Sequence, residues 1–162
     1  MARMFFALVK VGNQVLAIGG FAMICLPTVS SHNLINNTWA SNLPPMNKGR
    51  SGHAACLLGF HVFVFAGAIG FGKFANSLEK IHTSFLESNG TIQWTLIELR
   101  QDSGLYRERP AVAPLNEFDI VILGGQAGLT YLGDVIIFDT ITETCQKVVS
   151  EGYKFLAWGN QC

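Results

Sequence analysis

The chain has 162 residues, with 11 Lys or Arg, 11 Asp or Glu and a formal net charge of zero at pH 7. This balance gives no electrostatic basis for binding nucleic acid or an acidic membrane surface. Hydrophobic residues make up 49% of the chain and charged residues 14%, whereas about 25% charged residues is common in soluble domains.

A three-fold internal repeat organises the chain. Each copy begins with an arginine, reaches a pair of small residues at the end of an apolar run, and closes at an aromatic or Cys position. The three copies are Arg3 to Gly19-Gly20 to Trp39, Arg50 to Ala66-Gly67 to Trp94, and Arg109 to Gly124-Gly125 to Cys145. The arginine precedes the pair by 16, 16 and 15 residues, and the pairs recur at intervals of 47 and 58 residues. Such a period indicates a propeller or a solenoid.

Four apolar runs rich in β-branched and aromatic residues predict strands, at 15–18, 60–65, 119–123 and 135–138. Their nearly continuous apolar character is typical of strands covered on both faces. Segments 32–39 and 138–145 line up, and each predicts a strand end, a polar turn and a new strand.

The second copy is longer than the others. It has 27 residues from Gly67 to Trp94, against 19 and 20 in the other copies. We therefore expect one inserted hairpin or loop, with residues 88–91 as its turn because Asn-Gly readily adopts the positive φ angles of a tight hairpin.

The stretch Arg50-Ser51-Gly52-His53, followed by residues 54–67, resembles the kelch repeat: an arginine, a hydrophobic strand, a tight turn, a second hydrophobic strand and the small pair. Segment 44–46 (Pro-Pro-Met) is similar to the usual kelch link between blades. The resemblance covers about residues 3–145. It departs from the family pattern at Ala66, where a glycine is usual, at His32 and Phe138, where a tyrosine is usual, and at Cys145, where a tryptophan is usual.

The resemblance implies an all-β fold: a kelch-type β-propeller segment of about three four-stranded blades plus the start of a fourth. The expected repeats are residues 3–46, 47–106 and 107–150, and residues 151–162 start a fourth blade or form a tail. Closed propellers have typically 4 to 8 blades. We therefore expect a fragment of a longer protein, two copies that associate, or a product with exposed, adhesive blade edges.

Structural repeat positions follow from the same pattern: Gly19, Gly20, Gly67, Gly124, Gly125, Trp39 and Trp94. We expect Gly20, Gly67 and Gly125 to be required most strictly, because the small pair permits a turn that a Cβ would obstruct.

The resemblance also implies a non-enzymatic module that binds a protein partner through loops on one face, with a ubiquitin-ligase adaptor or an actin-associated protein as alternatives. Arg3, Arg50 and Arg109 are candidates to present a shared positive mouth to an acidic peptide. The structural alternative is that each arginine ties its own loop to backbone carbonyls.

Aromatic residues after the small pairs form the second candidate surface: Phe21, Phe71, Phe74 and Tyr131. Exposed aromatics on a rigid frame are typical of binding hot spots. Alternatively, each caps the core of its own blade.

An enzyme is the less favoured class, although some kelch-like propellers are oxidases or sugar isomerases. The four histidines (32, 53, 61 and 82), the three tyrosines (106, 131 and 153) and the acidic residues show no clustered spacing. The cysteines at 25, 56, 145 and 162 form no CxxC pair. We therefore predict no catalytic residue, metal or cofactor.

Residues 54–71 are long enough to cross a bilayer as a helix. However, Gly59, Gly67 and Gly70 fall where the repeat requires turns, so we expect no membrane span. Residues 4–9 are too short for the core of a signal peptide. Free thiols in strands suit a reducing compartment, and we expect a cytoplasmic protein.

Overall fold

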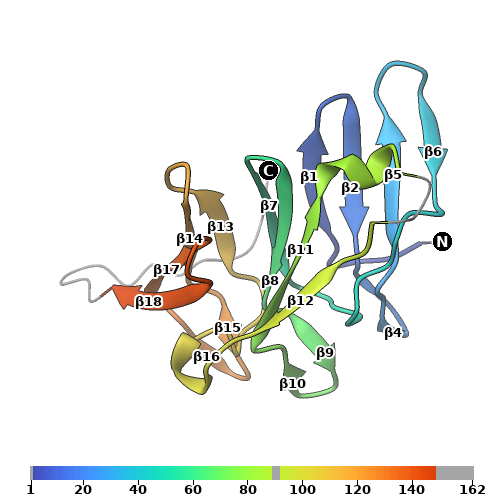
Figure 1. Ribbon diagram of the computed structural model, residues 1–162. Helices are drawn as coiled ribbons and strands as arrows, with labels where there is room; N and C mark the ends of the chain where they lie inside the picture. The colour runs from blue at the N-terminus through green and yellow to red at the C-terminus, as the bar shows by residue number, and fades with distance from the viewer. Residues whose placement is uncertain (1, 89–91, 149–162) are drawn as a thin grey trace.

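The three-fold repeat of the sequence corresponds to three four-stranded antiparallel sheets (Figure 1). The computed structural model describes residues 2–88 and 92–148. Within these ranges there are 18 strands, two short 3-10 helices and no α-helix, which confirms the all-β class. Residues 89–91 of the predicted turn and the expected fourth unit at 151–162 lie outside the described residues.

Each sheet has the same order along the chain. Sheet 1 is β1 (Ala7–Val11), β2 (Gln14–Ile18), β5 (Val29–Asn33) and β6 (Thr38–Ala40). Sheet 2 is β7 (Ala54–Leu58), β8 (His61–Phe65), β11 (Ser77–His82) and β12 (Thr95–Glu98). Sheet 3 is β13 (Ala111–Pro114), β14 (Asp119–Leu123), β17 (Val135–Asp139) and β18 (Thr144–Val148). All four predicted strands and both predicted hairpins are therefore present.

A small two-stranded hairpin is inserted between the second and third strands of every sheet. These hairpins are β3 (Phe21–Ala22) with β4 (Ile24–Cys25), β9 (Ala68–Gly70) with β10 (Lys73–Phe74), and β15 (Gln126–Ala127) with β16 (Thr130–Tyr131). The helices η1 (Thr83–Leu86) and η2 (Gln101–Ser103) lie in connections. Helix η1 occupies the extra length of the second copy, between β11 and β12, where the insertion was expected.

Sheet 2 is packed between sheets 1 and 3. Along β8, Val62 and Val64 belong to the apolar core shared with sheet 1, whereas Phe63 and Phe65 belong to the core shared with sheet 3. Because both faces of the strand are covered, every position has to be apolar. This packing explains the low charge fraction of the chain.

Residues 54–71 do not form a helix. They contain β7, β8 and β9, with a turn at Gly59. Among the described residues, no helix is long and apolar enough to cross a membrane.

The first strands of the sheets lie next to each other, since β7 contacts both β1 and β13. Just before these strands, three equivalent residues adopt a left-handed backbone: Phe5, Gly52 and Arg109, with φ of 56°, 59° and 55°. We call these positions the inner turns. The Gly52 N–H donates to the Phe5 carbonyl, and the Arg109 N–H donates to the Gly52 carbonyl. One hydrogen bond thus joins each inner turn to the next.

The small pairs adopt one turn conformation three times. Their φ angles are 60° and 109° at Gly19-Gly20, 60° and 91° at Ala66-Gly67, and 57° and 98° at Gly124-Gly125. A Cβ on the second residue would lie 2.9 Å from the Met4 carbonyl oxygen in sheet 1 and 2.7 Å from the Glu108 carbonyl oxygen in sheet 3. The second position therefore requires glycine for both conformation and space.

We predict that Gly125→Val lowers the free energy of unfolding by about 2 to 4 kcal/mol, through backbone strain and the close approach of Glu108. Urea unfolding followed by circular dichroism measures the change. Gly70→Ala is the matched control, because a Cβ there meets nothing within 4 Å and its φ is not left-handed. An unchanged midpoint for Gly125→Val would contradict this account of the turn.

Candidate functional site

An arginine holds the small pair of each sheet in place. In sheet 2, Arg50 Nη1 donates to the carbonyls of Ala66 (3.0 Å) and Ser77 (2.8 Å). In sheet 1, Arg3 Nη1 donates in the same way to Gly19 and Thr28, both at 3.0 Å. Ser77 and Thr28 lie at the start of the third strand of their sheets. We call this arrangement the arginine clip, because it joins the small pair to the third strand and fixes both ends of the inserted hairpin.

In sheet 3 the clip is Arg107, and the assignment of Arg109 to this position was wrong. Arg107 Nη1 donates to the Gly124 carbonyl at 2.7 Å, and the guanidinium pairs with both carboxylate oxygens of Asp134 at 2.6 and 2.9 Å. The β-bridge from Glu108 to Gln126 matches the bridges of residues 4 and 51 to 21 and 68. The turn between β13 and β14 is one residue longer than its counterparts, so a constant spacing selects the wrong arginine.

The clip of sheet 2 is completely buried. Arg50 and Glu79 have no exposed surface, and their charged groups lie 3.2 Å apart. Glu79 also accepts the backbone N–H groups of Asn47 and Lys48, which belong to the connection from sheet 1. The structural interpretation of this arginine is therefore the one that the geometry supports.

The three predicted arginines do not share one surface. Arg50 is buried, Arg3 is half-buried by its clip, and Arg109 is exposed with its guanidinium 5.0 Å from the centre of the Phe5 ring. Arg109 thus contributes a contact between the inner turns of sheets 1 and 3, and no common positive mouth is formed with Arg50.

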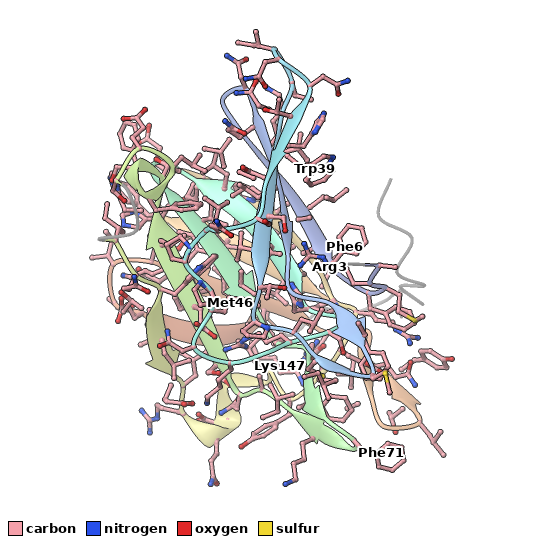
Figure 2. All side chains as sticks on the ribbon, turned by 90° about the vertical axis from the view of Figure 1, so that its right-hand side faces the viewer. Arg3, Phe6, Trp39, Met46, Phe71 and Lys147 are labelled. Carbon is pink, nitrogen blue, oxygen red and sulfur yellow. The ribbon has the colours of Figure 1, made fainter. Side chains whose placement is uncertain are left out.

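The inserted hairpins project from one end of the three sheets, at the bottom of Figure 1. Each carries one large apolar side chain at its tip. Met23, Phe71 and Leu129 have relative exposures of 93%, 106% and 97%. Figure 2 shows Phe71 pointing away from the body of the protein. We call this end the hairpin face and the three residues the tips.

Sequence reasoning found part of this face. Of the four predicted loop aromatics, Phe21, Phe71 and Tyr131 are exposed on the hairpins, whereas Phe74 is half-buried in β10. Met23 and Leu129 were missed because only aromatic residues were considered. The usable signal was position, since each tip follows the second residue of its small pair by three or four residues.

The hairpin face is nearly uncharged. Within the hairpins (21–25, 68–74 and 126–131), Lys73 is the one charged residue. The opposite end also exposes apolar side chains, including Phe60 and Ile141, but its turns contain Glu117, Asp119 and Asp139. A core poor in charge and rich in large apolar groups is what distinguishes a protein interface from the remaining surface.

No catalytic or metal arrangement is formed by the described residues, which contain no group of three or more His, Cys, Asp or Glu side chains placed to hold a metal. His61 and His82 contact each other with ring centres 5.1 Å apart. Burial raises the pKa of the Cys56 thiol to about 12 and that of Cys145 to about 11. Both thiols are therefore protonated near neutral pH and are poor nucleophiles.

His53 lies between the small pairs of sheets 1 and 2. A Cβ on Gly19 would lie 2.6 Å from its Cε1, and a Cβ on Gly67 would lie 2.7 Å from its Cβ. Burial and the charge of Arg50 lower the pKa of His53 to about 3. This imidazole is therefore neutral in the folded protein.

Comparison with known proteins adds no assignment, because no family model and no curated protein matches the chain.

We predict that Arg50→Ala lowers the free energy of unfolding by about 3 to 5 kcal/mol, because it leaves the Glu79 carboxylate buried without a counter-charge. Chemical denaturation at pH 7 measures the loss. Arg109→Ala, at an exposed arginine in the next repeat, is the control and should change stability by no more than about 1 kcal/mol. Equal effects of the two variants would show that the clip does not stabilise the fold.

We also predict that stability falls as the pH is lowered from 6.5 to 5. His53 remains neutral in the folded state down to about pH 3, whereas in the unfolded chain it takes up a proton below about pH 6.5. Acid therefore favours the unfolded state, by up to about 1.4 kcal/mol per pH unit. Denaturation at several pH values should give this slope for the wild type and a smaller one for His53→Asn. Parallel slopes would contradict the prediction.

Proposed function

We propose that the chain is part of a kelch-type β-propeller that serves as a non-enzymatic protein-binding module, with the hairpin face as its binding surface. The observation that carries the proposal is the repeated tip. Three equivalent hairpins each expose one large apolar side chain at the same end of the molecule. Evolution of three such side chains on clipped frames has no evident role in folding, because the tips contact no core.

The kelch-type assignment is supported by the order and packing of the sheets. Each sheet repeats one four-strand order, has its first strand toward the centre, and carries a hairpin between its second and third strands. The arginine, the small pair and the contact between them recur in all three. We interpret the sheets as blades on these grounds.

The chemistry of the hairpin face defines the partner. Met23, Phe71 and Leu129 would insert into apolar pockets or contact large apolar side chains of a peptide, because desolvated apolar and aromatic groups contribute most of the energy of an interface. Lys73 lies two residues after Phe71 and would pair with one acidic group. The partner is thus a protein segment with several large apolar residues and an adjacent Asp or Glu.

A cytoplasmic location is part of the proposal. Cys25, Cys56 and Cys145 are free thiols in the described part of the chain, and free thiols persist in a reducing compartment.

We predict that a random peptide display library selected on the immobilised chain yields peptides that combine large apolar residues with an acidic residue. Replacing all three tips with serine should weaken these peptides at least about tenfold, a loss typical of removing hot-spot side chains. Binding is measured by fluorescence polarisation, and circular dichroism confirms that the variant remains folded.

Phe60→Ser is the matched control, because Phe60 is also an exposed aromatic but lies in the turn between β7 and β8, away from the hairpins (Figure 1). It should leave the affinity unchanged. Peptides that bind the triple variant as tightly as the wild type, or that lose affinity with Phe60→Ser, would place the binding surface elsewhere.

A further inference from the structure

The face of sheet 3 that points away from sheet 2 is apolar at positions that are buried in the other sheets. It is formed by Ala111, Ala113, Val121, Leu123, Val135 and Ile137, all exposed or half-buried. The strand registers make Leu123 equivalent to Ile18 and Phe65, which are both fully buried by the next sheet. We call this surface the outer face of sheet 3.

The face of sheet 1 that points away from sheet 2 shows the same property (Figure 2). It carries Leu8, Val15, Ala17, His32 and Trp39. Trp39 and Trp94 occupy equivalent positions of their sheets, yet Trp94 is 5% exposed against the core of sheet 1, whereas Trp39 is 65% exposed. We call this surface the outer face of sheet 1.

Backbone groups at these two faces complement each other as well. The Gly20 N–H donates to the Arg50 carbonyl and the Gly67 N–H to the Arg107 carbonyl, so each sheet donates to the next. Among the described residues, the equivalent N–H of Gly125 in sheet 3 has no acceptor and the equivalent carbonyl of Arg3 in sheet 1 has no donor. The same relation holds at the inner turns for the Arg109 carbonyl and the Phe5 N–H within these ranges.

We propose that two copies of this chain associate, with the outer face of sheet 3 of each copy packed on the outer face of sheet 1 of the other. The contact would continue the two interfaces that already exist between the sheets of one chain, with apolar faces and donor and acceptor groups in the same relation. Both halves of the contact are present on one chain, so a second copy is the occupant that fits without further assumption.

Closure of the pair follows from the number of sheets. Three sheets in each copy give a ring of six, which lies within the 4 to 8 blades of closed propellers. A contact between two different faces closes when the rotation it generates completes a ring, and otherwise it produces open filaments. The ring therefore contains two identical interfaces and stops at two chains. This inference rests on the blade interpretation of the sheets but not on peptide binding by the hairpin face.

Sedimentation equilibrium of the 162-residue chain at micromolar concentration tests the proposal. The expected mass is twice the chain mass of 17.7 kDa. Ile137→Lys on the outer face of sheet 3 and Trp39→Glu on the outer face of sheet 1 should each weaken the dimer at least about 100-fold, since each buries a charge in both interfaces. Phe71→Ser, on the hairpin face, should leave the dimer intact.

Mixing the two variants provides a test that does not depend on the loss of association. One complete interface remains possible between the unaltered outer faces, so the mixture should form a heterodimer although each variant alone is monomeric. A monomeric wild type, a series of oligomers beyond two chains, or a mixture that stays monomeric would overturn the proposal. Circular dichroism of each variant verifies its β structure, and peptide binding by the same samples reports on the hairpin face independently.

Discussion

The arginine clip is the interaction on which the rest of the structure depends. The small pair has left-handed φ angles and turns the chain sharply, which leaves its carbonyls directed into the protein. Buried carbonyls require donors, and one guanidinium supplies donors to the pair and to the start of the third strand at once. The charge of this cation is balanced by Glu79 in sheet 2 and by Asp134 in sheet 3. Each hairpin is consequently anchored at both ends.

Stacking of the sheets then determines the composition. Sheet 2 is covered on both faces, so its strands alternate between two apolar cores rather than between core and solvent. The cation of the clip is tolerated inside this packing because its N–H groups are paired with backbone and carboxylate oxygens. A chain with few charges can therefore enclose a buried ion pair, provided that every polar atom of the pair has a partner.

Local sequence patterns predicted the strands, the small pairs and their hairpin turns, because these depend on residues close together in the chain. Arg107 was missed because one extra residue between β13 and β14 shifts the spacing without changing the geometry. The exposure of Trp39 could not be predicted at all. Trp39 and Trp94 have the same residue type and the same register, and only the presence of a neighbouring sheet makes one buried and the other exposed. Packing between repeats is not encoded in the repeat itself.

The hairpin face and the outer faces are distinct surfaces, and their separation has a consequence for binding. The tips extend from one end of the sheets, whereas the outer faces lie along the flanks of sheets 1 and 3 (Figures 1 and 2). A ring built by continuing the contacts between sheets keeps all hairpins at the same end, since each sheet is related to the next by the same rotation. Two copies would then present six tips on one surface. A partner with two matching segments would bind the second one at a high effective concentration, because the first has already brought it close. Association of the chain would thus increase affinity without any change in the contacts at a single tip.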